Sequence, residues 1–193
     1  MQVASLTAKQ MVGSRIVSLA YGYQTHSSAL EVALNSKVIE FLKDNPTLIN
    51  DVGYIPRLND FGWQYGKIRW LENKDFNSEL SDDFSKVWIS GAIIQAGDML
   101  TNYNYFDRNP LLEMIRHMRN AVAHGNRFRI DSKDKLIKFP AHNRGARVSG
   151  WHAPTFYEIT YELNEREFMG NYMLEGNILD VLLSAGLQLI ESK

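Results

Sequence analysis

Residues 109–125 read NPLLEMIRHMRNAVAHG, and this stretch decides the fold. Asn109 is a typical N-cap, Pro110 suits the first position of a helix, and Gly125 suits the left-handed residue that follows the last turn. The pattern therefore predicts a helix over residues 110–124. On a wheel of about 100° per residue its apolar side chains fall within about 60° of one another and form one core-facing surface: Leu111, Ile115, Met118 and Val122.

Helical periodicity also predicts the elements on either side of this helix. Residues 6–43 fit two helices better than one, because Ser28 and Glu31 form a capping box in the middle of the pattern. Residues 47–80 mix glycines with aromatic side chains without a clear period, so we expect loops with short helical pieces there. Two further helices are expected, over residues 81–103 and after the cap formed by Asn164 and Glu167.

The period of the apolar residues changes from about 3.6 to 2 after the helix over 110–124. Residues 157–163 alternate between apolar and polar side chains, which is typical of a half-buried strand. Residues 128–130 and 136–139 are suitable partner strands, with a polar turn between them. The sequence therefore predicts a single, mainly α domain over residues 1–193, a helical bundle with a small antiparallel β-sheet inserted at residues 126–163.

Composition excludes several classes of protein. With 193 residues, of which 45% are hydrophobic and 22% charged, the chain has the size and composition of one folded domain rather than of a disordered or fibrous protein. It contains no cysteine, which excludes disulfides, thiolate zinc sites, iron–sulfur clusters and thiol nucleophiles. Lys9 and Arg15 interrupt the first apolar stretch, so we expect no signal peptide, no membrane span and a cytoplasmic location. No sequence motif for a cofactor or a metal is present, and we expect neither.

Charge is unevenly distributed along the chain. The net charge is -1, but residues 108–147 contain ten basic and three acidic residues and carry +7, which leaves -8 for the remainder. Such a segment suggests a localised cationic face suited to phosphates. The alternative is that these charges pair with acidic helices elsewhere in the fold.

Polar side chains follow the solvent side of the helix over 110–124. Arg116, Asn120 and His124 succeed one another at i, i+4 steps and form a stripe that ends at the C-terminus of the helix. Arg119 lies at the edge of the apolar face. It precedes His124 by five residues, or roughly 140° of rotation and 7.5 Å of rise, so one helix cannot easily direct both side chains at one phosphate.

The string RNAVAHG, from Arg119 to Gly125, resembles the signature of the HEPN superfamily, in which an Arg, a polar residue and a His follow one another at the end of a helix. The motif covers seven residues, and the helical layout on either side is similar to HEPN architecture over most of the chain. The resemblance implies a compact α-helical bundle that dimerises. In many members it implies a metal-independent endoribonuclease linked to toxin–antitoxin, abortive-infection or phage-defence systems.

Position 126 departs from one branch of that superfamily. HEPN toxins that are controlled by a nucleotidyltransferase antitoxin carry a Tyr two residues after the motif His, and that Tyr is the modified group. This chain has Asn126 there. We therefore expect no inactivation by nucleotidylation at this position, while an antitoxin or inhibitor protein of another kind is compatible with the resemblance.

The motif residues suit the cleavage of RNA without a metal. That reaction needs a base for the 2′-hydroxyl, an acid for the leaving 5′-oxygen and a cation for the charge of the phosphorane. An imidazole can make either proton transfer, and a guanidinium binds phosphate oxygens. We therefore expect His124 to transfer protons, Arg119 to stabilise the phosphate and Asn120 to orient the imidazole or the phosphate by a hydrogen bond. Both subunits of a homodimer are expected to contribute to each site.

Three more arginines are candidate contacts for RNA. Arg116 belongs to the polar stripe, and Arg127 and Arg129 flank Phe128, so that alternation places both on one face of the expected strand. Trp151 is a candidate to stack on a base.

Two other interpretations remain open. A non-catalytic HEPN-like adaptor would use the same basic face to bind RNA or nucleotide, because a fold does not settle activity. In a purely structural interpretation, Arg119 packs its stem on the core edge, His124 caps the last carbonyls and Gly125 ends the helix. Asp98, on the preceding helix, is a candidate to orient His124, and His117 is expected to be a partly buried helix residue rather than a catalyst.

Overall fold

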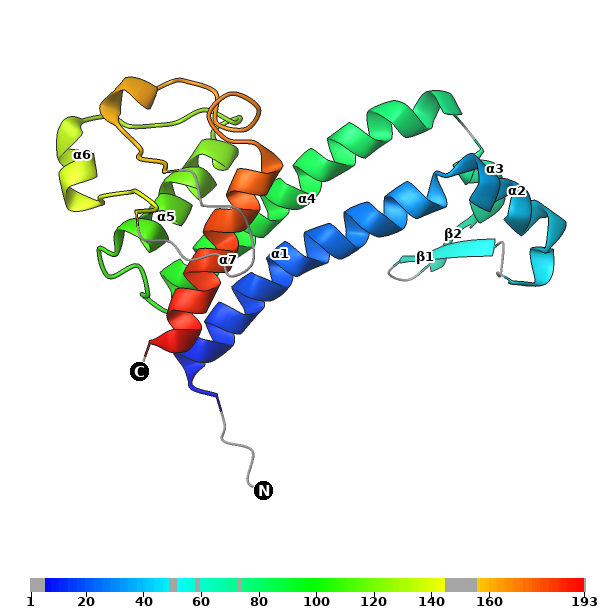
Figure 1. Cartoon of the computed structure of the whole chain (residues 1–193), viewed down its shortest axis with the longest axis horizontal. Helices are drawn as coiled ribbons and strands as arrows, with labels where there is room; N and C mark the ends of the chain where they lie inside the picture. The colour runs from blue at the N-terminus through cyan, green and yellow to red at the C-terminus, as the bar shows by residue number, and fades with distance from the viewer. Residues whose placement is uncertain (1–5, 49–51, 58–59, 73, 145–155, 193) are drawn as a thin grey trace. The chain divides into compact units, whose positions relative to one another are not determined.

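The computed structural model describes residues 6–48, 52–57, 60–72, 74–144 and 156–192; of these, residues 52–57, 60–65, 70 and 74–82 are described by their backbone. The chain is mainly helical, as the sequence predicts (Figure 1). It divides into two compact units, Met1–Tyr23 with Lys86–Lys193, called the bundle unit below, and Gln24–Ser85, called the hairpin unit. The single-domain expectation stays a prediction, because compact units within one chain do not by themselves define domains. No helix in the described part of the chain has the length and apolar character needed to cross a membrane.

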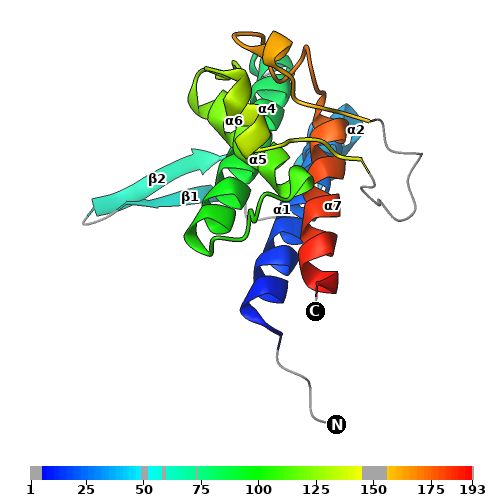
Figure 2. The same ribbon diagram turned by 90° about the vertical axis from the view of Figure 1, so that its left-hand side faces the viewer.

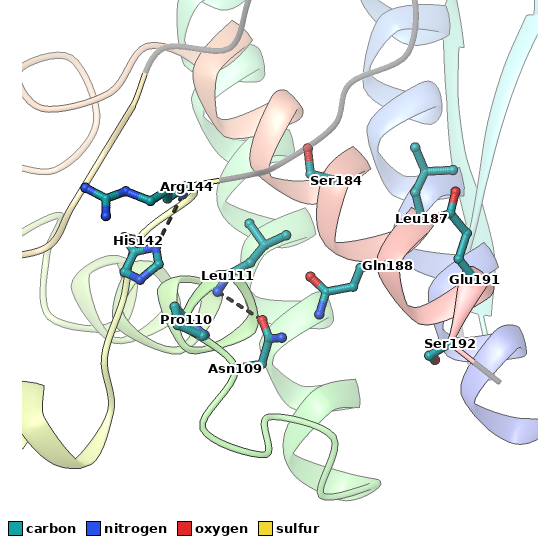
Figure 3. A pocket seen from close by; sticks show the side chains of 10 residues that line it. All are labelled: Asn109, Pro110, Leu111, His142, Arg144, Ser184, Leu187, Gln188, Glu191 and Ser192. Atoms are coloured by element: carbon teal, nitrogen blue, oxygen red, sulfur yellow. Dashed lines mark hydrogen bonds between the residues drawn. The ribbon is translucent and has the colours of Figure 1, made fainter.

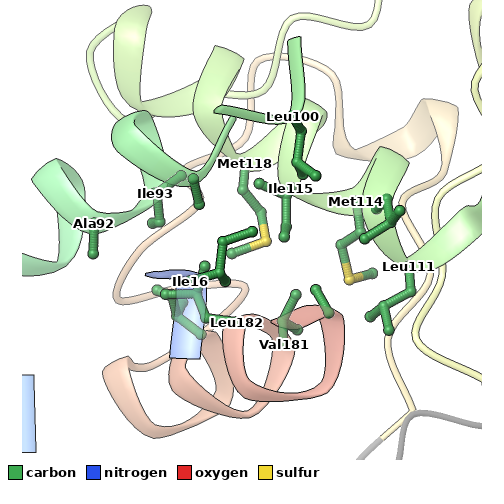
Figure 4. Close-up of a cluster of buried hydrophobic side chains, with 14 of the residues drawn as sticks. Ile16, Ala92, Ile93, Leu100, Leu111, Met114, Ile115, Met118, Val181 and Leu182 are labelled. Carbon is green, nitrogen blue, oxygen red and sulfur yellow. The ribbon is translucent and has the colours of Figure 1, made fainter. Parts of the chain in front are cut away.

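The core of the bundle unit is formed by four helices. They are α1 (Ala8–Ala33) as far as Tyr23, α4 (Lys74–Asn102) from Lys86 onward, α5 (Pro110–Ala123) and α7 (Glu175–Glu191). Their apolar side chains meet in one cluster (Figure 4). Each helix contributes fully buried residues, among them Ile16, Ile93, Leu100, Ile115, Met118 and Leu182. This core fixes α5, which carries the motif, against its neighbours.

The predicted helix over residues 110–124 is confirmed as α5. Asn109 caps it, because its Oδ1 accepts hydrogen bonds from the backbone N–H groups of Leu111 and Leu112 at 3.1 and 3.3 Å. Gly125 follows the helix with a φ of +72°, the left-handed conformation that glycine adopts without strain. The expected apolar face is buried at Leu111, Ile115 and Met118 and partly buried at Val122.

Two glycines allow α1 and α7 to cross with their backbones in contact. A Cβ atom at Gly13 would lie 2.6 Å from the carbonyl oxygen of Gly186. A Cβ at Gly186 would lie 2.8 Å from the carbonyl oxygen of Gly13 and 2.6 Å from Cγ2 of Val17. The two helices run side by side in both views (Figure 1 and Figure 2). The absence of side chains at these two positions therefore determines how closely α7 packs on α1.

The predicted break within residues 6–43 was placed at the wrong residue. α1 runs through Ser28 without interruption, and the break falls at Asn35. The Asn35 side chain accepts a hydrogen bond from the backbone N–H of Lys37 at 3.0 Å and caps α2 (Ser36–Asp44). Asn35 is the better cap because its carbonyl satisfies a first-turn amide, whereas a serine inside a long helix costs little.

Two other predicted helix starts were wrong. α4 begins at Lys74 instead of residue 81, since polar residues inside a helix carry only a small penalty. α7 begins at Glu175 and not at the expected cap of Asn164. Asn164 is engaged elsewhere, because its Oδ1 accepts from the backbone N–H of Ile130 at 2.8 Å.

The sheet predicted at residues 126–163 is wrong for the described part of that segment, which contains no strand. Most of the expected strand over 136–139 lies in a helix, α6 (Lys133–Lys138). Ser132 caps this helix by accepting from the backbone N–H of Lys135 at 3.4 Å. A local cap with an acidic first turn thus prevails over a short apolar run, which is ambiguous between helix and strand.

The other two expected strands pair only locally. Phe128 is held by backbone hydrogen bonds to residues 165 and 166 instead of by a neighbouring strand. Residues 161–163 form a 3-10 helix, η2 (Tyr161–Leu163). Isolated bridges replace a ladder, Arg127 with Glu167 and His142 with Glu158.

The hairpin unit contains strands that the sequence pattern did not reveal. The helical pieces expected within residues 47–80 are present, but β1 (Val52–Arg57) and β2 (Asp60–Gly66) form an antiparallel pair beside them. Gly53 and Pro56 interrupt the strand pattern, and the register shifts next to Pro56, which cannot donate to the ladder. The unit also contains α2, η1 (Pro46–Leu48), α3 (Lys67–Leu71), the end of α1 and the start of α4.

Candidate functional site

The Arg119 side chain extends from α5 toward α4, where it contacts two consecutive residues, Gly97 and Asp98. At Gly97 a Cβ would lie 2.8 Å from Cγ and 2.9 Å from Cβ of Arg119, so only glycine leaves room for the arginine stem. Nε and Nη2 of Arg119 donate to Oδ1 of Asp98 at 3.2 and 3.0 Å. The arginine side chain is still 40% exposed. The guanidinium is therefore oriented by α4 but accessible from solvent, with N–H groups left over for a phosphate.

Asp98 was a candidate partner of His124, and it contacts Arg119 instead. Sequence analysis also missed Gly97. No spacing in the sequence indicates either contact, because 21 residues separate Asp98 from Arg119 and only the packing of α4 on α5 brings them together.

His124 stands at the C-terminal end of α5 as its cap residue. Its backbone N–H donates to the carbonyl oxygens of Asn120 and Ala121 at 3.1 and 3.2 Å, which completes the last turn. Its side chain is exposed, and within the described residues the imidazole has no hydrogen-bond partner. Asn120 lies one turn earlier, with its side chain also unpaired there and half-buried. A free imidazole and a free carboxamide therefore border the same end of the helix.

Arg119 and His124 do not meet within one chain. The guanidinium lies against Asp98 on α4, whereas the imidazole lies exposed at the end of α5, and no hydrogen bond joins the two groups in the part described. This agrees with the five-residue spacing, which turns the two side chains roughly 140° apart.

Asn126 fixes the chain immediately after the motif, a role that sequence analysis missed. It follows Gly125 with a φ of +65°, a conformation that Asn tolerates better than most residues. Its Oδ1 accepts from the backbone N–H of Met169 at 2.8 Å, and its Nδ2 donates to the carbonyl oxygen of Met169 at 3.0 Å. Asn126 thus tethers the motif end of α5 to the segment before α7.

Arg116 was expected to contact RNA; its side chain is 32% exposed, and neighbouring residues of the protein engage its guanidinium. Its Nε donates to Oε2 of Glu113, a carboxylate that is only 1% exposed. The guanidinium carbon lies 3.9 Å from the ring centroid of Phe106 and 4.7 Å from that of Phe139. Arg116 therefore neutralises a buried charge and lies against two aromatic rings, and its contact with RNA stays a prediction.

Arg127 and Arg129 are exposed on either side of the buried Phe128, although the strand expected there does not form. Both are paired with Glu165. Nη1 of Arg127 donates to its backbone oxygen at 2.8 Å, and Nη1 of Arg129 lies 3.1 Å from its carboxylate. Glu165 therefore neutralises Arg129, whereas the bond of Arg127 to a backbone oxygen leaves its charge in place. Trp151 lies outside the described residues.

Replacing Arg116 with alanine is expected to lower the free energy of unfolding by about 2 kcal/mol, because a buried carboxylate loses its partner. Urea titration of the purified variant measures this loss. Arg129→Ala is the matched control, since it breaks an exposed pair and should cost less than about 0.5 kcal/mol. Equal effects of the two substitutions would show that the Arg116–Glu113 pair is not structural.

His117 is only 3% exposed, so it is more deeply buried than the partly buried residue that the sequence predicted. Its Nε2 lies 3.1 Å from the carbonyl oxygen of Phe139. Burial lowers the pKa of His117 below its usual value; the hydrogen bond to Phe139 opposes this shift, and the charges of Lys135 and Arg116 add to it. His117 is thus a neutral structural histidine.

This pKa shift predicts a loss of stability in acid. Below pH ~6.5 the unfolded chain binds a proton that the folded chain refuses, so the free energy of unfolding falls by up to about 1.4 kcal/mol per pH unit until the folded pKa is reached. Above pH ~6.5 His117 is neutral in both the folded and the unfolded chain, so it no longer changes the free energy of unfolding with pH. The measurement is urea unfolding from pH 5 to 8 of the wild type and His117→Gln, which cannot titrate. Parallel pH profiles of the two proteins would contradict the prediction.

Among the described residues no group of three or more His, Asp and Glu side chains is arranged to hold a metal ion. Comparison with known proteins gives no match to any protein-family model, any curated protein or any solved structure.

Proposed function

We propose that the chain is a metal-independent endoribonuclease of the HEPN type whose active site consists of Arg119, Asn120 and His124. The observation that carries the proposal is the state of His124, an exposed and unpaired imidazole at the end of a helix that the core holds in place. A structural histidine would be buried or hydrogen-bonded, as His117 is. An imidazole with open access to solvent suits proton transfer.

The reaction uses the 2′-hydroxyl of the substrate as nucleophile. A base removes the proton from that hydroxyl, the oxygen forms a bond to phosphorus, and the bond from phosphorus to the 5′-oxygen breaks as that oxygen takes up a proton. His124 makes one of these proton transfers, and Arg119 stabilises the negative charge that builds up on the phosphorane. Asn120 orients the phosphate. The products are a 2′,3′-cyclic phosphate and a free 5′-hydroxyl, and DNA is not a substrate because it lacks the attacking group.

The separation of Arg119 from His124 supports a site shared between two subunits. A two-fold axis next to the end of α5 would place the guanidinium of one copy opposite the imidazole of the other, so that both face one phosphate. Asp98 holds Arg119 in a fixed direction before the substrate binds, which reduces the entropic cost of forming the complex.

The test is the incubation of purified protein with a labelled RNA oligonucleotide in excess chelator, with the all-deoxy version of the same sequence as control. We expect cleavage of the RNA alone, and a cyclic phosphate terminus that mass spectrometry identifies as one water lighter than the linear phosphate. Cleavage that stops on chelation, or that also occurs in the deoxy strand, would refute the mechanism.

A shared site predicts complementation between two inactive variants. When Arg119→Ala and His124→Ala chains are mixed, half of the dimers are mixed and each of those contains one intact site. About a quarter of wild-type activity should therefore return. The measurement is initial cleavage rate after subunits have been exchanged by dilution and reconcentration. A mixture as inactive as its components would place both residues in the same chain's site.

A second candidate function is a non-catalytic adaptor that binds RNA or nucleotide through the same face. The ion pair between Arg119 and Asp98 favours it, since the carboxylate competes with phosphate for the guanidinium. In the chelator assay the adaptor would retain the RNA on a filter without cleaving it. The resemblance to HEPN proteins suggests a toxin–antitoxin, abortive-infection or phage-defence setting, with an antitoxin or inhibitor protein as a further partner.

A further inference from the structure

Asparagines stand at both ends of α5, and they form different kinds of contact. At the start of the helix, Oδ1 of Asn109 accepts a hydrogen bond from the backbone N–H of Leu111, two residues further on (Figure 3). At the end of the helix, the side chain of Asn126 bonds to Met169, which lies 43 residues away in the sequence. The first contact is a local helix cap, whereas the second joins the end of α5 to another part of the bundle unit.

The segment that holds Asn126 is itself anchored in the core. The Asn126 carboxamide bonds to both the N–H and the carbonyl group of Met169, and the backbone oxygen of Asn126 accepts from the N–H of Phe168 at 2.8 Å. Phe168 is 0% exposed, and its ring packs edge-on against the buried Phe128 with 5.4 Å between the ring centroids. Three hydrogen bonds therefore connect the chain after the motif to a fixed part of the fold.

The position of His124 depends on this turn. The imidazole is exposed and makes no hydrogen bond in the described structure, so its place follows from the backbone that carries it. Gly125 is left-handed, with a φ of +72°, and among the described residues nothing lies within 4 Å of the position where a Cβ would stand. The turn thus has no side-chain packing at Gly125, and the next anchor along the chain is Asn126, which is also left-handed with a φ of +65°.

We propose that Asn126 is a positioning residue for the imidazole of His124. This role rests on the proposed function, in which His124 must meet a phosphate that Arg119 stabilises. A displacement of a catalytic group by about 1 Å can cost about 100-fold in rate, so a loosened turn would slow the reaction without the loss of any group that touches the substrate. Asparagine suits the position because it tolerates the left-handed conformation and carries a donor and an acceptor on one short side chain.

The test is Asn126→Gly in the full chain, because glycine keeps the left-handed backbone and removes the side-chain tether. At a temperature where the variant is folded, kcat for a labelled RNA oligonucleotide should fall by about 10-fold or more, while KM stays within about twofold of wild type. Asn126→Asp keeps the acceptor for the Met169 N–H and loses the donor, so it should also lower kcat.

NMR relaxation gives a second readout that needs no activity. The order parameter of the His124 backbone amide should fall from about 0.85, the value of rigid backbone, toward about 0.6 in Asn126→Gly. Asn104→Gly is the matched control, since Asn104 is also left-handed, with a φ of +53°, but its side chain has no hydrogen-bond partner in the described part of the chain. It should change neither kcat nor the order parameter.

Two different failures can be told apart. The positioning role is overturned if Asn126→Gly melts at a lower temperature yet keeps the kcat and the His124 order parameter of wild type, since the tether then serves the fold alone. A wild-type protein that cleaves no RNA refutes the proposed function instead, and an unchanged order parameter in Asn126→Gly would overturn the positioning of His124 in that case as well.

Discussion

Gly13→Ala is expected to lower the free energy of unfolding by about 3 kcal/mol and the melting temperature by about 10 °C. The new methyl group would collide with the carbonyl oxygen of Gly186, which belongs to the backbone of α7 and cannot rotate away. The two helices must then separate, and the core side chains between them lose contacts along the whole crossing. Circular dichroism melts and urea titrations measure the loss.

Gly91→Ala is the matched control for this substitution. Gly91 also lies inside a helix of the bundle unit, on α4, but nothing lies within 4 Å of the position where a Cβ would stand. Alanine there should stabilise the protein by roughly 0.5–1 kcal/mol, because it has the higher helix propensity. If both substitutions change stability in the same direction, the close crossing of α1 and α7 does not determine the packing of the bundle.

His124→Ala is expected to reduce the rate of RNA cleavage by about 100- to 10,000-fold, since the removal of a general acid or base typically costs that much. Stability should be unchanged, because the side chain is exposed and the capping bonds of residue 124 come from its backbone. Arg119→Ala should cost about 100- to 1,000-fold in cleavage, as the loss of charge stabilisation does in other enzymes. Initial rates at saturating RNA measure both.

Lys86→Ala is the control for the loss of a positive charge on the bundle unit. Lys86 is exposed at the start of the α4 segment in that unit and contacts none of the site residues in the described structure. Its replacement should leave the cleavage rate within twofold of wild type. Imidazole added to His124→Ala should restore part of the activity. If His124→Ala cleaves as fast as wild type, the imidazole does not take part and the adaptor becomes the better interpretation.

Local sequence signals predicted the elements that depend on neighbours in the chain. The cap at Asn109, the proline after it and the left-handed Gly125 define α5 within a few residues, and the 3.6 period defines which face is buried. The motif residues could be identified for the same reason, since all of them belong to one helix. Short apolar runs do not distinguish a strand from a helix. Most of the strand expected at residues 136–139 therefore lies in α6, which Ser132 caps.

The sequence by itself determined a mainly helical chain, the helix that carries Arg119 and His124, and the absence of any thiol chemistry. Tertiary structure alone decided that Arg119 pairs with Asp98 and that Glu113, the neighbour of Arg116 on α5, is buried. It also decided that α7 packs on α1 at two glycines, and that Ser184 is buried without a hydrogen-bond partner among the residues that the structure describes. The physical reason is range: caps and periodicity act between residues up to four positions apart, whereas these contacts join residues on different helices or are set by burial, which only packing creates.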